Sequence, residues 1–583
     1  MGNPKSELII AEYKTMSREA EIKTCQNCKQ EFTIEPDDFT FYEKMKVPAP
    51  TFCPECRAQR RFVWRNERTL YKRKCDLCSK NIIGLYPEKT PFPVYCYECW
   101  YGDGWDPLSF GMDYNSSIPF FTQLKTLTQK VPRLAIWVVA STKSEYTNQS
   151  YFNKNTYLSF ALRDSENVMY AGRTKANKNS VDITYTHFSE LMYDTVNVEK
   201  SYNSQHIYDS EGIIDSSFMF SCRNCQNCFG GANLRSANYV FFGEQLLKEE
   251  YKEKVDKLNL GNRNEVKELR EKFDDYSLKQ IHRAMELVNC TNCVGNYLGN
   301  SKDCYYVFDG FELENARHSI WVFTSKDISD CYGMGGSNNV YETIGCEDVA
   351  NCFFGNIVDS STDVFYSDLC KGSQNLFGCV GVRSKNYCVL NKQYSKEEYA
   401  EIVKKIKEDM DKNPYIDSGG IVYKYGEFFP PALSPFAYNE TIAQEFYPKS
   451  KEEIINLGYR FSEQGTKNYI PTIHVGDIPE DISSVTDSFT EEIIECRNKG
   501  AVETQCTLAF KIMPEELSFY KKQEIPISEY CPNCRHYLRL AKHLPPQIFN
   551  RTCAKCGKEA RSAYSPSRPE IIYCEECYKS EVV

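Results

Sequence analysis

Residues 222–257, CRNCQNCFGGANLRSANYVFFGEQLLKEEYKEKVDK, return as residues 370–405, CKGSQNLFGCVGVRSKNYCVLNKQYSKEEYAEIVKK, and this duplication decides the fold. The offset between the two stretches is 148 throughout, so that Phe229-Gly230 matches Phe377-Gly378. Both stretches contain KEEY at the start of a charged helical pattern. The duplication predicts two equivalent lobes, each closed by the same segment and followed by a helix.

A shorter repeat runs through both lobes, in which Asn or Asp precedes an apolar residue. Asp330-Cys331, Asn351-Cys352 and Asp363-Val364 are examples, and most steps are near 11 residues or twice that. Short β-prone strings such as CYYVF and SIWVF are separated by Gly, Asn, Asp and Ser. The pattern predicts a mainly β chain, a two-lobe β-solenoid with rungs of about 22 residues. Seven cysteines are expected to be small inward-facing residues of the ladder: Cys304, Cys331, Cys346, Cys352, Cys370, Cys379 and Cys388.

The rest of the chain divides by composition. A helical hairpin is expected between the lobes, with apolar residues at helical spacing from Val266 to Met285. The stretch YGEFFPPALSPFAYNETIAQEFYP is rich in aromatic residues and Pro, which predicts an extended strap packed on another surface. The expected segments are a double zinc-ribbon module (1–110), a linker with a short helix (111–143), lobe 1 (144–243), the hairpin (244–289), lobe 2 (290–393), a helix (394–412), the strap (413–490) and a second double zinc-ribbon module (491–583).

Eight of the 28 cysteines form four Cys-x-x-Cys pairs near the N-terminus: Cys25/Cys28, Cys53/Cys56, Cys75/Cys78 and Cys96/Cys99. Two such pairs bind one tetrahedral ion through four thiolates, which favours structural zinc over iron or an iron–sulfur cluster. Disulfides are less favoured, because no export signal is recognisable. The simplest pairing is sequential, and an interleaved pairing stays open.

The same module recurs at the C-terminus with an offset of 478 and no gap. Cys28 matches Cys506 in this alignment, but Cys25 matches Glu503, so Cys496 is expected to replace the missing ligand, with His536 as the alternative. About four zinc ions are therefore expected in the whole chain. The predicted C-terminal ligands are Cys496, Cys506, Cys531, Cys534, Cys553, Cys556, Cys574 and Cys577.

Two further cysteine pairs flank the helical hairpin. Cys225/Cys228 and Cys290/Cys293 have the spacing of a fifth metal site. However, Cys225 and Cys228 match Ser373 and Leu376 of the second lobe, which indicates ordinary ladder positions. The sequence leaves both interpretations open and favours the ladder.

The stretch between Cys53 and Cys78 is strongly basic in a chain of net charge −10. A helix over residues 57–70 would place its arginines along one side, with aromatic residues interleaved for stacking on bases. This predicts a phosphate-contacting face. The alternative is a solvated basic face, or one that pairs with acids elsewhere in the chain. The residues of the predicted face are Arg57, Arg61, Trp64, Arg65, Arg68 and Lys72.

Several function classes are disfavoured by what the sequence lacks. It contains no P-loop, GxSxG or HExxH motif, no evident small-molecule site and no run of 18 apolar residues. Its first residues lack the apolar core of a signal peptide, so a cytoplasmic protein is expected. Gly2 followed by Ser6 matches the loose N-myristoylation pattern.

Long strings of the chain resemble an uncharacterised cysteine-rich zinc-ribbon family of candidate-phyla bacteria and some giant viruses. These strings are FCPECRAQRRFVWRNERTLYKRKCDLC, PFPVYCYECWYGDGWDP, GEFFPPALSPFAYNET and RPEIIYCEECY, and the resemblance covers nearly the whole chain. Some members of the family bear a CoA-transferase label, for which this sequence lacks the large α/β pattern. The resemblance implies no activity.

The leading hypothesis is a non-catalytic zinc-binding scaffold that contacts RNA, or an RNA–protein assembly, through the basic face. The first alternative is a structural component of a viral or cellular assembly. The second is a carbohydrate-acting β-helix protein, which would need carboxylates converging on one strand face.

Overall fold

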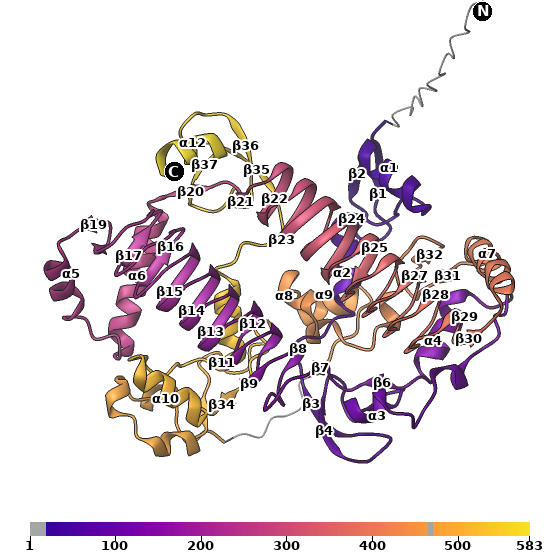
Figure 1. The fold of residues 1–583 in the computed structure, drawn as a ribbon, viewed down its shortest axis with the longest axis horizontal. Helices are drawn as coiled ribbons and strands as arrows, with labels where there is room; N and C mark the ends of the chain where they lie inside the picture. The colour runs from indigo at the N-terminus through magenta and orange to yellow at the C-terminus, as the bar shows by residue number, and fades with distance from the viewer. Residues whose placement is uncertain (1–18, 464–469, 583) are drawn as a thin grey trace, which may run out of the picture.

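The computed structural model describes residues 19–463 and 470–582, and it shows a mainly β chain built around a two-lobe β-solenoid (Figure 1). The myristoylation pattern at Gly2 lies outside the described residues. In Figure 1 the two rows of strands lie side by side, and their closing ends point to opposite sides of the molecule, where α5 (Lys248–Val255) and α7 (Lys396–Lys412) lie.

Lobe 1 is a parallel ladder that an antiparallel strand, β19, closes. Its strands are β7 (Val138–Val139), β8 (Asn148–Tyr151), β9 (Lys154–Tyr157), β10 (Phe160–Arg163), β11 (Glu166–Met169), β12 (Gly172–Lys175), β13 (Lys178–His187), β14 (Glu190–Glu199), β15 (Tyr202–Glu211), β16 (Ser217–Phe220), β17 (Phe229–Ala232), β18 (Val240–Phe241) and β19 (Glu244–Gln245).

Lobe 2 has the same plan and closes with β30. Its strands are β21 (Leu287–Val288), β22 (Thr291–Gly299), β23 (Lys302–Arg317), β24 (Ile320–Gly335), β25 (Asn338–Ile344), β26 (Ala350–Phe353), β27 (Thr362–Phe365), β28 (Gln374–Phe377), β29 (Asn386–Val389) and β30 (Lys392–Gln393).

Each rung of the solenoid contains 12 residues, so the predicted rung of about 22 residues is wrong. In lobe 2, Val340 pairs with Cys352, Cys352 with Val364, and Val364 with Leu376. The first rungs of lobe 2 differ by one residue, because a register shift lies between Val294 and Gly295. The observed repeat of 11 to 12 residues is therefore one full turn of the ladder.

The Asn and Asp residues of the short repeat occupy corners of the rung. From Gln149 to Phe242 every third residue has a positive φ, as Asn167 does at 54° and Asp182 at 58°. Asn and Asp tolerate this left-handed conformation better than other non-glycine residues. The residue after each corner points into the ladder, which explains why an apolar residue follows.

The interior of each lobe is a narrow column of these inward residues. In lobe 1 it includes Val168, Ile183 and Val198, all fully buried. Serines share the column, and they satisfy the backbone: the Ser201 amide donates to Ser189 Oγ at 3.0 Å. The seven cysteines predicted as ladder residues of lobe 2 all lie in its buried column.

The helical part of the insert between the lobes ends earlier than the sequence predicts. α5 (Lys248–Val255) and α6 (Arg263–Leu278) form the hairpin, and the chain then enters β20 (Ile281–Arg283). β20 pairs with β37 (Ile571–Tyr573) of the C-terminal module. This tertiary pairing overrides the helical periodicity that continues through Ile281 to Met285. α7 (Lys396–Lys412) follows lobe 2, as expected.

Short strands and helices form the terminal modules. The N-terminal part contains β1 (Glu21–Thr24), β2 (Glu31–Ile34), α1 (Pro36–Met45), α2 (Pro54–Phe62), β3 (Tyr71–Lys74), β4 (Asn81–Gly84), β5 (Val94–Tyr95), α3 (Tyr97–Tyr101), η1 (Pro107–Phe110), α4 (Phe120–Thr128) and β6 (Arg133–Leu134). The C-terminal module contains β33 (Ile494–Glu495), β34 (Ala509–Phe510), α10 (Pro514–Lys522), α11 (Pro532–Leu540), β35 (Phe549–Thr552), β36 (Glu559–Ser562), β37 and α12 (Glu575–Val582).

The strap region packs on the N-terminal module and lobe 2. Phe428, Phe429 and Ile442 are buried in one cluster with Phe62 and Trp64 of the module. Its elements are β31 (Tyr415–Ile416), β32 (Val422–Tyr423), η2 (Pro431–Leu433), η3 (Tyr438–Glu440), α8 (Ile442–Phe446), α9 (Lys451–Asn456), η4 (Val475–Asp477), η5 (Ile482–Ser484) and η6 (Asp487–Glu491).

The N-terminal module packs on lobe 2, and the C-terminal module packs on lobe 1. α2 of the N-terminal module packs on β24 and β25 of lobe 2, whereas α11 of the C-terminal module packs on β13 and β14 of lobe 1. The lobes also meet through the C-terminal module, where the His543 ring lies between Tyr185 and Tyr297 with centroid separations of 4.3 and 4.4 Å. Each lobe is therefore held by the module farther from it in sequence.

Candidate metal centres

Four groups of four cysteines lie in the terminal modules, and within each group the sulfur atoms lie within 4.8 Å of one another. The pairing is sequential and not interleaved. The groups are cluster 1 (Cys25, Cys28, Cys53, Cys56), cluster 2 (Cys75, Cys78, Cys96, Cys99), cluster 3 (Cys496, Cys506, Cys531, Cys534) and cluster 4 (Cys553, Cys556, Cys574, Cys577).

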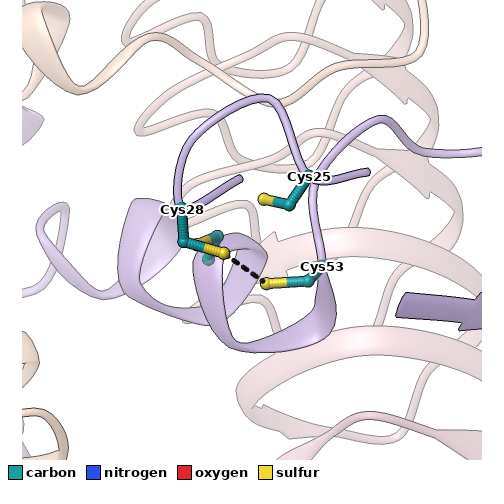
Figure 2. A group of neighbouring side chains, drawn as sticks. Cys25, Cys28 and Cys53 are labelled. Atoms are coloured by element: carbon teal, nitrogen blue, oxygen red, sulfur yellow. Dashed lines mark hydrogen bonds between the residues drawn. The ribbon is translucent and has the colours of Figure 1, made fainter. Parts of the chain in front are cut away.

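The sulfur–sulfur distances fit a tetrahedral ion. They are 3.7 Å for Cys28–Cys53 and 3.9 Å for Cys78–Cys96. Zinc–sulfur bonds of about 2.3 Å give a tetrahedron with edges of about 3.8 Å, whereas a disulfide needs about 2 Å. Figure 2 shows the sulfurs of Cys25, Cys28 and Cys53 pointing toward a common centre. These clusters can therefore bind metal ions.

Local backbone geometry brings each pair of sulfurs together. The residue after the first pair is left-handed in three clusters, at Lys29, Ser79 and Gly557, and its amide donates to the carbonyl of the first cysteine. The second pair sits at a helix N-terminus: Cys53 precedes α2, and Cys531 precedes α11. The positive end of a helix dipole stabilises the thiolates that metal binding requires.

Hydrogen bonds to sulfur support the same charge state. The backbone amides of Cys96, Cys531 and Cys574 donate to Cys75, Cys496 and Cys553 Sγ, each at 3.3 Å. Such donors orient thiolates toward one ion and stabilise their charge.

Cys496 is the fourth cysteine of cluster 3, as the repeat with an offset of 478 predicts. Its Sγ lies 3.8 Å from Cys534 Sγ, and the longer loop places it where Cys25 lies in cluster 1. The alternative ligand, His536, is buried and contacts the Glu445 carboxylate at 3.2 Å. Burial lowers the pKa of His536 to about 3, so its neutral ring hydrogen-bonds Glu445 and is not part of the metal group.

The fifth site is not formed among the described residues. Cys225 and Cys228 are buried in the interior column of lobe 1, whereas Cys290 and Cys293 pack against the column of lobe 2. The two pairs thus belong to different lobes. This is the ladder interpretation that the alignment with Ser373 and Leu376 favours.

The predicted basic face is wrong, because its side chains lie in the interior. Arg57, Arg61 and Trp64 are each 1% exposed, and Arg65 and Arg68 are 5% and 8% exposed. α2 also ends at Phe62, so the last two arginines are not on the helix. Of the six predicted residues, only Lys72 is exposed.

Carboxylates of lobe 2 and the strap neutralise these arginines. Arg57 and Arg61 both contact Asp330 at 3.0 Å, and Arg60 contacts Glu342 at 2.8 Å and Glu427 at 2.6 Å. Burial alone would raise the pKa of Asp330, but the two guanidinium groups hold it well below its usual value. The basic stretch is thus an internal clamp between α2 and lobe 2.

Arg65 and Arg68 are held differently. Arg65 forms an ion pair with Glu67 at 2.9 Å, and Glu67 also pairs with Arg173 of lobe 1 at 3.0 Å. Arg68 lies 4.7 Å from the centroid of the Phe160 ring, and burial lowers its pKa to about 10. Neither guanidinium is available to a nucleic acid.

The C-terminal module repeats the clamp on lobe 1. Arg535 and Arg539 contact Asp182 at 3.3 and 2.6 Å, and Arg535 also contacts Glu516 at 3.1 Å. Sequence reasoning missed this pair. The two internal repeats could have predicted it. An offset of 478 carries Arg57 and Arg61 onto Arg535 and Arg539. An offset of 148 carries Asp182 onto Asp330.

No family model matches the chain, and no curated protein matches it in sequence. The resemblance to the cysteine-rich family therefore stays a prediction. None of the helices in the described ranges combines the length and apolar character that spanning a bilayer requires.

Proposed function

We propose that this protein is a non-catalytic scaffold in which four structural zinc ions hold the terminal modules against a two-lobe β-solenoid. The observation that carries the proposal is the closed donor set of each cluster. Four cysteine sulfurs surround each centre at tetrahedral distances, so the protein alone fills the four positions of a structural zinc ion. A catalytic zinc ion instead keeps one position for water or substrate.

The positions of clusters 1 and 3 indicate what structural role their ions would have. Cys53 and Cys56 flank the first turn of α2, and Cys531 and Cys534 flank that of α11. These are the helices whose arginines enter lobe 2 and lobe 1. Metal binding would fix the start of each helix and thereby the position of its buried cations. Zinc in a small module supplies folding free energy directly, about 10–16 kcal/mol in zinc-finger peptides.

Soft thiolates in a tetrahedral array suit zinc or iron, and the paired Cys-x-x-Cys spacing of a structural zinc site favours zinc of the two. None of the 28 cysteines, all of which lie within the described residues, forms a disulfide, which fits a protein kept in a reducing compartment such as the cytoplasm.

The test is the metal content of the full-length protein, measured by native mass spectrometry and elemental analysis. Four zinc ions per chain are expected. A matched control is the double variant Cys225→Ser/Cys228→Ser, which should still bind four. Chelation under reducing conditions should make the terminal modules sensitive to protease before the lobes. A metal-free chain with protected modules, or a stoichiometric iron content, would overturn the proposal.

A further inference from the structure

A groove of about 850 Å³ lies between the N-terminal module and the first rung of lobe 1. One wall is the β3–β4 hairpin and the start of α3, next to cluster 2, and the other is the chain from Ala135 to Glu145. The two walls come from different parts of the fold, so the groove exists only when the module is docked.

Lysines from both walls line this groove. Lys72 and Lys74 lie on β3, Lys80 lies in the hairpin turn, and Lys143 lies on the lobe wall. All four are exposed, and none forms an ion pair with a carboxylate of the described residues. Alternate residues of a strand point to the same side, which places Lys72 and Lys74 about 7 Å apart on one face. Four lysine ammonium groups that form no ion pair within the described ranges thus line one groove.

The C-terminal copy of the hairpin shows that the fold does not need Lys72 and Lys74. Arg73 lies between them, is buried, and donates to the Pro87 carbonyl at 2.8 Å. Its equivalent, Arg551, donates to the carbonyl of Ser565, which is Pro87 shifted by 478. The flanking positions, however, are Asn550 and Thr552. The structural arginine is thus shared by both copies, as is Lys80, which matches Lys558, whereas Lys72 and Lys74 occur only in the copy that lines the groove.

The remaining lining distinguishes between anionic ligands. Tyr97 is 40% exposed, and the half-buried Ile83 and Val138 provide apolar surface beside it. Glu88, Glu98 and Glu145 also line the groove. Their carboxylates can accept hydrogen bonds from the amino groups of bases, which the side chains of an acidic peptide lack. Ammonium groups for phosphates, an aromatic face and acceptors for base edges together match a single-stranded nucleic acid.

We propose that the groove between the β3–β4 hairpin and the first rung of lobe 1 binds single-stranded nucleic acid through its phosphates, with Tyr97 stacking on a base. The proposal rests on the proposed function only in that cluster 2 holds one wall of the groove. It places nucleic-acid contact on the exposed lysines and not on the buried arginines of α2.

The test uses full-length, metal-loaded protein and fluorescent 12-nucleotide RNA and DNA strands, with anisotropy measured from about 50 to 300 mM salt. The double variant Lys72→Asn/Lys74→Thr carries the residues of the C-terminal copy. It should lose about tenfold in affinity at about 100 mM salt. Its plot of log affinity against log salt should be shallower by about 1.4, since each phosphate contact on a single strand contributes about 0.7.

A matched control removes the same charge elsewhere. Lys257→Asn/Lys267→Thr changes two highly exposed lysines of the helical insert and should bind like the unaltered protein. Lys143→Asn tests the opposite wall, away from the cysteines, and should weaken binding severalfold. Metal content is measured for every variant, so that loss of a zinc ion is separated from loss of the groove.

Three results would overturn the proposal. One is the absence of binding at about 50 mM salt by protein that contains four ions. Another is equal weakening by the groove variants and the control. The third is competition by polyglutamate as effective as that by RNA, which would assign the groove to acidic peptides.

Discussion

Asp182 and Asp330 occupy equivalent positions of the two lobes, and each receives two arginines from the opposite end of the chain. Asp182 binds Arg535 and Arg539, whereas Asp330 binds Arg57 and Arg61. The two duplications in the sequence are therefore combined into two equivalent module–lobe contacts. The two clamps therefore connect the N-terminal module to lobe 2 and the C-terminal module to lobe 1, segments that are far apart in sequence.

Removing the carboxylate of either clamp should destabilise the protein strongly. In Asp330→Ala the buried Arg57 loses its carboxylate partner and Arg61 keeps only Glu342, at 3.8 Å, which costs about 3–5 kcal/mol of unfolding free energy. Asp182→Ala should have a similar effect through Arg535 and Arg539. Urea unfolding of the metal-loaded protein measures both. The control is Glu347→Ala, which breaks the half-exposed ion pair with Arg163 and should cost less than about 1 kcal/mol. Equal effects of the control and Asp330→Ala would contradict the clamp.

Cluster 3 should depend on Cys496 and not on His536. We expect Cys496→Ala to lower the metal content from four ions to three, because three thiolates bind zinc much less tightly than four. His536→Gln should leave four ions bound, since a glutamine can keep the hydrogen bond to Glu445. Native mass spectrometry of both variants gives the answer. Loss of an ion from the His536 variant alone would show that the ligand set is wrong.

The corner conformation should make Asn167 sensitive to β-branched substitution. Its φ of 54° is left-handed, and its side chain accepts from Asn155 and donates to Asn179, both at 2.9 Å. Asn167→Val removes the two hydrogen bonds and adds backbone strain of about 1–3 kcal/mol. Asn167→Gly removes only the hydrogen bonds and should be milder. The free energy of unfolding of the two variants should differ accordingly, and a valine no worse than glycine would argue against the left-handed corner.

The buried His282 should make the protein less stable in acid. Burial lowers its pKa from 6.5 to about 4, and its ring packs between Phe220 and Tyr564. Between pH 6.5 and 4 the unfolded chain takes up a proton at this site and the folded chain does not. The neutral, buried His282 therefore contributes about 3 kcal/mol to the unfolding free energy above pH 6.5, and this contribution is lost as the pH falls to 4.

The His282→Gln variant isolates this contribution, because the thiolates and other histidines respond to acid in both proteins. The difference in unfolding free energy between His282→Gln and the unaltered protein should narrow by about 3 kcal/mol from pH 7 to pH 4. A difference independent of pH would show that His282 is protonated in the fold or solvent-accessible.

The sequence predicts the terminal clusters well because metal ligands follow short, fixed spacings. Even the irregular ligand Cys496 follows from the failure of the offset at Glu503. The rung length is harder to predict, since polar residues such as Ser189 and Ser201 share the interior column with apolar ones. They occupy the same interior position in consecutive rungs, so a pattern of apolar residues does not mark every turn of the ladder.

Local sequence could not decide between a nucleic-acid face for the basic stretch and its pairing with acids elsewhere in the chain, the alternative that the structure shows. Arg57 and Asp330 are 273 residues apart, and nothing near Arg57 indicates that a carboxylate neutralises it. The same holds for β20, whose helical pattern is overridden by pairing with β37 at the far end of the chain. Both errors come from long-range contacts that replace what the nearby residues favour.

The crossed attachment of modules and lobes has a consequence for biosynthesis. When the ribosome has made Arg57, its counter-ion lies 273 residues ahead, which at 5–20 residues per second takes roughly 14 to 55 s. During that time the first module can bind metal but cannot dock. The last module meets the reverse situation, since Asp182 is made 357 residues before Arg539. The nascent chain is thus expected to carry an undocked N-terminal module, with the arginines of α2 unpaired, for most of its synthesis and to close lobe 1 only after release.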